Sequence, residues 1–170
     1  MIALQRLLNR LWVFTICGIL MGGYIYQFIK HEEPCPLCML QRLAMFGVAA
    51  GVLLNLRFGF KEEHYGLDLL ASFFGLIVSL RQIALHVCPQ FPTFGEPILN
   101  YDLYVWSFFV FMCSIFATSV LLMIHLFIHQ KPARPVWAFW DKLAFALVLL
   151  LALANTITTL IQCGLSPCQG

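Results

Sequence analysis

One stretch decides the fold: residues 103–127 read LYVWSFFVFMCSIFATSVLLMIHLF. It contains no Asp, Glu, Lys or Arg. An α-helix needs roughly 20 apolar residues, with a range of about 17–25, to cross the hydrocarbon core of a bilayer. The stretch is long enough for that and therefore predicts a transmembrane helix.

Four further apolar runs lie elsewhere in the chain, at about 11–29, 39–60, 67–87 and 143–161. The second is short as an apolar run and reaches spanning length only with residues 39–42 and 57–60 added at its two ends. Of the 170 residues, 61% are hydrophobic and 11% are charged, whereas soluble domains have about 25% charged residues. We predict an all-α membrane protein, a four-helix transmembrane bundle plus a fifth transmembrane helix, in a single integral membrane domain spanning 1–170.

Glycines cluster in the first two predicted spans. Gly18, Gly22 and Gly23 lie in the first, and Gly47 and Gly51 lie in the second. Small residues let membrane helices approach one another closely. Both groups therefore predict close helix packing.

Five spans put the two ends of the chain on opposite sides of the membrane, and the basic residues are divided unequally between those sides. Lys30, Arg42 and Arg81 fall on or near one side. The other side has seven: Arg6, Arg10, Arg57, Lys61, Lys131, Arg134 and Lys142. Because cytoplasmic segments are enriched in Lys and Arg, we predict a cytoplasmic N-terminus and an outer C-terminus.

This orientation sorts the seven cysteines. Cys17 and Cys113 lie deep within spans, where a free cysteine behaves as a small hydrophobic residue. The remaining five are predicted on the outer side, where disulfides persist: Cys35, Cys38, Cys88, Cys163 and Cys168. None faces the cytoplasm, which favours thiol redox chemistry.

The sequence Cys35-Pro36-Leu37-Cys38 begins the second span. This spacing suits either a redox-active disulfide or zinc. A structural zinc site needs four ligands, and the predicted outer loops contain no second Cys-x-x-Cys and no His-x-x-x-His pair. A helix N-terminus lowers a thiol pKa, and Arg42 follows Cys38 by one helical turn. A thiolate at the bilayer edge needs a lipid-soluble electron acceptor, for which a quinone is suitable.

The motif resembles the DsbB-type disulfide bond formation proteins. The resemblance rests on Glu33-Pro34-Cys35-Pro36-Leu37-Cys38 followed by Gln41-Arg42, on Arg81, and on Leu103-Tyr104-Val105-Trp106, and it covers about residues 11–127. It implies a four-helix bundle in the bacterial inner membrane, with its redox cysteines on the periplasmic side.

The resemblance also implies a reaction. Such a protein takes electrons from a periplasmic thioredoxin-fold protein, DsbA, and passes them to ubiquinone or menaquinone. Cys38 would contact the quinone with Arg42 beside it, and Cys35 would exchange with a second cysteine pair. Gln41, Arg81 and His86 are the other candidate quinone-binding residues, with His86 as a possible proton shuttle.

The chain departs from the family pattern in its second cysteine pair. The family has two cysteines in its second outer loop, whereas Cys88 stands alone here and a fifth span delivers Cys163 and Cys168 to the same side. Either Cys88 pairs with one of these two, or Cys163 and Cys168 pair with each other, and spacing does not decide. The outer loop at 90–95, with two Phe residues, is a candidate docking strip for the partner.

Three other functions compete with this interpretation, one of them an assembly subunit whose disulfides are structural and which would show no redox turnover. A vitamin K epoxide reductase-like enzyme does related chemistry, but its Cys-x-x-Cys lies in the last helix of its bundle. A metal-binding or metal-transporting membrane protein would instead use the outer cysteines as ligands. The net charge of +2 and the lack of a basic run exclude a nucleic-acid-binding site.

Overall fold

The computed structural model describes residues 2–30, 35–87, 97, 99–128 and 137–163. These residues form five α-helices: α1 Ile2–Lys30, α2 Pro36–Phe58, α3 Glu62–Val87, α4 Leu103–Ile128 and α5 Phe139–Cys163. Each is long and apolar enough to cross a membrane. The described segments contain no β-strand. The predicted all-α class with five potential transmembrane helices is therefore confirmed.

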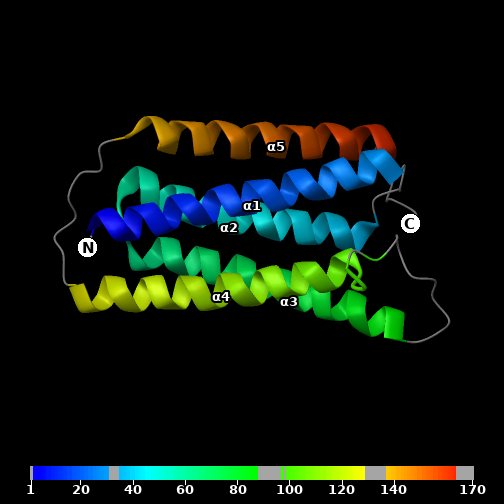
Figure 1. The fold of residues 1–170 in the computed structure, drawn as a ribbon, viewed down its shortest axis with the longest axis horizontal. Helices are drawn as coiled ribbons and strands as arrows, with labels where there is room; N and C mark the ends of the chain where they lie inside the picture. The colour runs from blue at the N-terminus through cyan, green and yellow to red at the C-terminus, as the bar shows by residue number, and fades with distance from the viewer. Residues whose placement is uncertain (1, 31–34, 88–96, 98, 129–136, 164–170) are drawn as a thin grey trace.

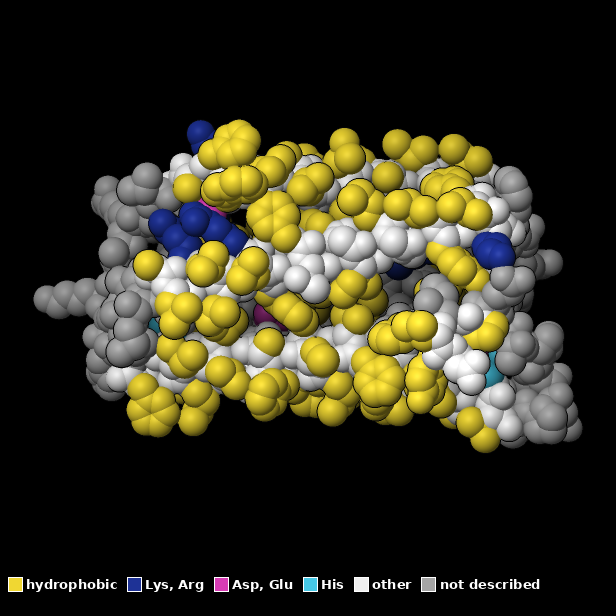
Figure 2. All heavy atoms as spheres, in the orientation of Figure 1, with side chains coloured by type: hydrophobic (Ala, Val, Ile, Leu, Met, Phe, Trp, Pro, Cys, Tyr) yellow, Lys and Arg dark blue, Asp and Glu magenta, His cyan; other side chains and the backbone are white. Residues whose placement is uncertain are grey.

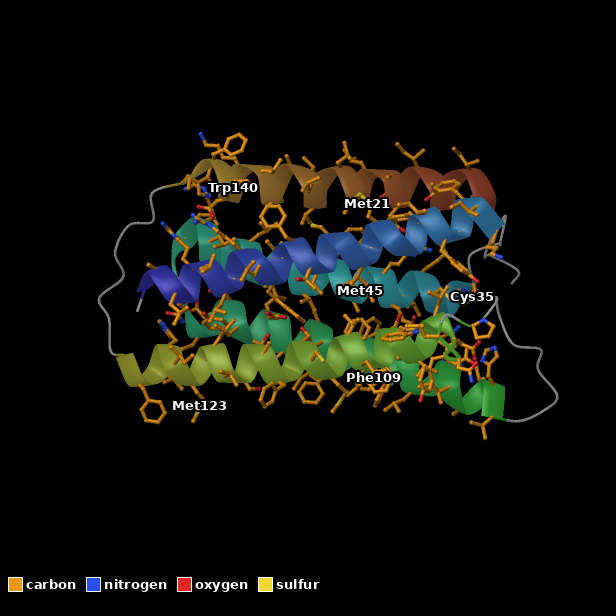
Figure 3. All side chains as sticks on the ribbon, in the orientation of Figure 1. Met21, Cys35, Met45, Phe109, Met123 and Trp140 are labelled. Carbon is orange, nitrogen blue, oxygen red and sulfur yellow. The ribbon has the colours of Figure 1, made fainter. Side chains whose placement is uncertain are left out.

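The helices lie side by side along the long axis of the molecule (Figure 1). α2 packs against α1 and α3, and α3 packs against α4, while α5 lies outside the other four and packs against α1 and α2. α2 and α4 begin at the end where α1, α3 and α5 finish. We call this the cysteine end, because Cys35 lies there (Figure 3), and the opposite end the N-terminal end.

The helices extend beyond the apolar runs that predicted them. α1 begins at Ile2 rather than near residue 11, and α3 and α5 begin at Glu62 and Phe139 rather than near 67 and 143. Hydropathy identifies the part of a helix that suits hydrocarbon, but the backbone hydrogen bonds continue into the flanking polar turns. α2 ends at Phe58 rather than near 60, because Gly59 adopts a φ of 90° that ends the helix.

The outer surface of the bundle is apolar. Figure 2 shows hydrophobic side chains over most of the visible face, with basic side chains gathered towards the N-terminal end. Phe109 and Met123 of α4 are examples, with 47% and 53% of their surface exposed (Figure 3). A surface of this kind would be unstable in water and suits contact with lipid.

Polar side chains instead turn inward and join the helices. Ser72 of α3 and Ser114 of α4 share a hydrogen bond of 2.8 Å. One turn away, the Thr118 hydroxyl donates to Asp68 Oδ2 at 2.9 Å. All four side chains are buried. Since lipid provides no hydrophobic force between membrane helices, such contacts and close packing are what hold them together.

The glycine prediction is right for α2 and wrong for α1. A Cβ atom at Gly47 would lie 2.8 Å from Ala71 Cβ, and one at Gly51 would lie 3.0 Å from Asp68 Cβ, so α2 and α3 pack closely through these positions. By contrast, added Cβ atoms on the α1 glycines would meet nothing within 4 Å: Gly18, Gly22 and Gly23. Gly23 lines a cavity rather than a helix contact.

Candidate thiol redox site

Cys35 is the N-cap residue of α2. Its backbone is extended, with φ −71° and ψ 148°, and its Sγ accepts a hydrogen bond of 3.1 Å from the Cys38 backbone N–H. The first helical residue is Pro36, whose missing N–H costs nothing at that position. The Cys-Pro-x-Cys sequence thus folds so that a sulfur takes the place of the oxygen in an ordinary N-cap.

The two sulfur atoms of the motif are close neighbours. Cys38 Sγ lies 2.6 Å from Cys35 Sγ, and both residues are free thiols. Hydrogen bonding from the Cys38 thiol, together with the backbone N–H groups of Leu37 and Cys38, outweighs burial and lowers the pKa of Cys35 to about 6. Because the ordinary pKa of a cysteine is about 8.5, this lowering favours the thiolate form of Cys35.

Gln82 of α3 contacts both sulfurs. Its Nε2 lies 3.4 Å from Cys35 Sγ and 3.5 Å from Cys38 Sγ. Its Oε1 accepts a hydrogen bond of 2.8 Å from Gln41 Nε2, which fixes which end of the Gln82 amide faces the thiols. Both glutamines are buried. The pair therefore presents a hydrogen-bond donor to a thiolate at either cysteine.

A cavity of about 140 Å³ opens beside the two cysteines. Helices α1 to α4 all contribute to its walls, which include apolar side chains such as Leu20, Met45 and Val110. The polar lining includes Arg42 and Gln41. An engineered apolar cavity of roughly 150 Å³ holds one benzene molecule. The cavity therefore has room for a single six-membered ring beside Cys38.

Arg42 is stacked on an aromatic ring at the edge of this cavity. Its Cζ lies 4.6 Å from the centroid of the Tyr24 ring. Tyr24 belongs to α1, is 6% exposed, and donates a hydrogen bond of 2.7 Å to Asn155 Oδ1 of α5. Arginine over a tyrosine face is a favourable cation–π arrangement. Residues of α1, α2 and α5 thus meet at Arg42. Among the described residues, Arg42 is the only Lys or Arg that lines the cavity.

Arg81, predicted to bind the quinone, is not brought to the cavity. Its side chain is exposed, and its neighbour Gln82 faces inward instead. Successive residues on a helix point about 100° apart, so both cannot face the same cavity. The resemblance had suggested Arg81, whereas its neighbour Gln82 is the residue that lines the cavity.

His86, the predicted proton shuttle, lies one turn beyond Gln82. Its ring stacks on the Tyr104 ring, which lines the cavity, with centroids 4.8 Å apart and planes at 25°. Its Nδ1 donates to the Gln82 carbonyl oxygen at 2.8 Å. In the neutral ring Nε2 is then the nitrogen that accepts a proton. His86 is therefore beside the cavity without forming part of its lining.

The other predicted cysteines are placed as follows. Cys88 and Cys168 lie outside the described residues, as does the loop at 90–95, and only the backbone of Cys163 is described. Cys17 is buried, whereas Cys113 is exposed on the outside of α4. Within the described ranges, no group of three or more His, Cys, Asp or Glu residues could hold a metal ion.

Gln82, Tyr24 and Asn155 were missed by the sequence analysis. Each is a polar side chain within an apolar span, which is itself a signal of function or of helix contact. The spacing of Gln82 from the motif gave no further sign, because only the antiparallel packing of α2 and α3 brings it to the sulfurs.

Comparisons with known proteins agree with the site. Residues 5–94 match the family described as Disulfide bond formation protein DsbB. A Disulfide bond formation protein B of Marinobacter nauticus is 33% identical over 158 residues, covering 83% of this chain and 86% of the relative. One from Chromohalobacter salexigens is 32% identical, covering 81% and 83% respectively. No solved structure matches the chain. The chain therefore belongs to the DsbB family of disulfide bond formation proteins, which are thiol oxidoreductases.

Proposed function

We propose that this protein is a membrane thiol:quinone oxidoreductase that reoxidises a periplasmic, DsbA-like thioredoxin-fold protein. The observation that carries the proposal is the meeting of three features at one cavity. A dithiol with a lowered Cys35 pKa, the guanidinium of Arg42 and apolar walls all border a space the size of one ring. Thiol exchange alone needs neither the cation nor the apolar cavity.

The walls of the cavity suit the head of a membrane quinone, and its size takes one six-membered ring, as in ubiquinone or in one of the two fused rings of menaquinone. Apolar side chains would hold the faces of the ring, and Arg42 and Gln41 would provide donors to its carbonyl oxygens. When bound, a quinone supplies an acceptor for two electrons and two protons. Cys38 would be the nearest electron donor, and His86 would exchange protons with the periplasm.

The cysteines would act in two exchange steps. A thiolate of the second cysteine pair attacks Sγ of Cys35 in the oxidised motif, and Cys38 leaves as a thiolate beside Arg42. The other thiol of that pair then attacks its own partner sulfur, and Cys35 leaves. One disulfide forms as another breaks, so two electrons reach the Cys35–Cys38 pair. The low pKa of Cys35 favours this second step, because a less basic thiolate leaves faster.

The second pair would come from Cys88, Cys163 and Cys168. We favour a disulfide between Cys88 and one of the two tail cysteines. This pairing requires a tail cysteine on the side of the redox motif, and α5 ends with Cys163 at the cysteine end of the bundle (Figure 1). A local pair of Cys163 with Cys168 is the alternative, and peptide mapping of the non-reduced protein separates the two.

We place the cysteine end at the periplasmic face of a bacterial inner membrane. The described basic residues at the N-terminal end support this orientation: Arg6, Arg10, Arg57, Lys61 and Lys142. Those on or near the cysteine end are fewer, namely Lys30, Arg42 and Arg81. The imbalance follows the positive-inside rule.

The test is quinone reduction by the purified protein in detergent. A reduced DsbA-like protein supplies the electrons, and loss of quinone absorbance is followed for the parent, for Cys38→Ala and for Cys113→Ala. The last variant is a matched control, because Cys113 is an exposed thiol that does not line the cavity. We expect turnover in the parent and in Cys113→Ala, and none in Cys38→Ala. Absence of turnover with both quinone classes, or equal turnover in all three proteins, would refute the proposal.

A further inference from the structure

Two polar contacts join α5 to α1 at equal spacing. Arg10 Nε and Nη2 donate to the Asp141 carboxylate at 2.6 and 3.0 Å, and the Tyr24 hydroxyl donates to Asn155 Oδ1 at 2.7 Å. Both pairs are separated by 131 positions in sequence, so the two helices run parallel in one register. The 14 residues between the contacts make about four helical turns, which returns each helix to the same face.

Only one of these contacts is linked to the cavity, and the link is through Arg42. The Arg10–Asp141 pair lies towards the N-terminal end, where α1 and α5 begin. The Tyr24–Asn155 contact lies towards the cysteine end, where the centroid of the Tyr24 ring lies 4.6 Å from Cζ of the Arg42 guanidinium. The chain of contacts therefore runs from α5 through α1 to a side chain of α2 that borders the cavity.

The hydrogen bond from Tyr24 to Asn155 directly affects the orientation of the Tyr24 ring. An arginine side chain has many rotamers, and the attraction to an aromatic ring holds it only while the cation lies over the ring face. The bond to Asn155 fixes the Tyr24 hydroxyl and thus the ring plane. Without that bond, Arg42 would spend more time away from the orientation that the structure shows, and a preorganised charge would be lost.

We propose that Asn155 and Tyr24 are positioning residues through which α5 orients Arg42 at the redox cavity. Neither residue needs to touch the substrate or the reacting sulfurs. Through Asn155, α5 thus contributes to the redox site. This contribution is separate from that of Cys163 and Cys168. The proposal rests on the proposed function for its effect on turnover, but the orientation of Arg42 can be measured separately.

The experiment compares Tyr24→Phe, Asn155→Ala and the double variant with Thr156→Ala. Tyr24→Phe keeps the ring and removes only the hydroxyl. Thr156→Ala is the matched control, because its hydroxyl donates to Ala152 O of its own helix at 3.0 Å and faces outward. The first readout is the rate at which phenylglyoxal modifies Arg42, followed by mass spectrometry. The second is kcat and KM for quinone reduction.

We expect both single variants to raise the rate of Arg42 modification and to lower kcat by about three- to tenfold, the factor that one ordinary hydrogen bond represents. KM for the reduced protein partner should stay within about twofold, since Arg42 borders the quinone cavity, whereas the partner is proposed to exchange with the second cysteine pair. The double variant should be no worse than Tyr24→Phe, because Tyr24→Phe already lacks the bond to Asn155. Thr156→Ala should match the parent.

Three outcomes would overturn the inference. The first is unchanged Arg42 modification in both single variants, even if their thermal stability falls, because the bond would then only hold the helices together. The second is additive loss in the double variant, and the third is an equal loss in Thr156→Ala. If the parent itself fails to reduce quinone, the proposed function is wrong, while the phenylglyoxal rates still decide whether α5 orients Arg42.

Discussion

Replacing Cys38 with alanine should raise the pKa of Cys35, even though Cys35 itself is unchanged. The largest cause of the lowered pKa is the hydrogen bond from the Cys38 thiol, across 2.6 Å. The variant removes this donor but keeps the backbone N–H at position 38, which lies 3.1 Å from Cys35 Sγ, and the Gln82 amide at 3.4 Å. Burial, which opposes the charged form, also remains.

The size of the effect follows from the strength of that bond. A hydrogen bond to a charged group contributes about 1.5–3 kcal/mol, and one pKa unit corresponds to about 1.4 kcal/mol. Removing it should therefore raise the pKa of Cys35 from about 6 by about 1–2 units, to about 7–8. The thiolate share of Cys35 near neutral pH would fall accordingly.

The assay is the pH dependence of iodoacetamide alkylation of Cys35 in the fully reduced protein, followed by mass spectrometry of its peptide. The alkylation rate rises with pH through the pKa, so its midpoint reports the pKa directly. Cys38→Ser is the matched control, because its hydroxyl still donates and should restore most of the shift. An unchanged midpoint in Cys38→Ala, or an equal shift in both variants, would refute the reasoning.

Three further predictions test the packing and the arrangement of the site. Gly75→Ala should destabilise the protein in detergent by about 1–3 kcal/mol, because its Cβ would lie 2.2 Å from the Phe111 ring. Gly66→Ala, with nothing within 4 Å, should not destabilise it, as thermal unfolding of both variants will show. Asp141→Ala should lower the free energy of unfolding by about 3 kcal/mol, since it leaves the Arg10 guanidinium without its carboxylate partner. A loss below about 1 kcal/mol would contradict this expectation. Arg81→Ala should leave KM for quinone within about twofold, because the Arg81 side chain faces away from the cavity. A larger rise of KM in steady-state assays would show that Arg81 does contribute to quinone binding.

The number and type of helices were readable from the sequence because lipid imposes a simple rule. A span must satisfy its own backbone and present apolar side chains, so residues 103–127 could hardly form anything else. Helix ends were less predictable. The first turns of α3 are polar, with Glu62 and Glu63, yet they are helical because backbone hydrogen bonding does not require hydrocarbon. Hydropathy therefore located the spans but not the full helices.

The site was predicted where its residues are adjacent in sequence and missed where packing creates it. Cys35, Cys38, Gln41 and Arg42 fall within two turns of one helix, so their common position follows from the motif. Gln82 comes from another helix, and its contact with the sulfurs depends on the rotation of α3 about its axis. A rotation of one residue would have brought Arg81 to the cavity instead, and sequence alone does not determine that rotation.

The fifth helix contained a signal that hydropathy overlooks. Asp141 and Asn155 stand 14 residues apart in α5, and Arg10 and Tyr24 stand 14 residues apart in α1, with Arg10 and Asp141 just before the apolar runs at 11–29 and 143–161. Polar side chains inside lipid need partners, so equal spacing in two spans indicates two helices that meet in parallel along one face. The register of α5 on α1 could therefore have been inferred from spacing. The contact of Tyr24 with Arg42 could not, because it depends on how α2 packs beside both helices.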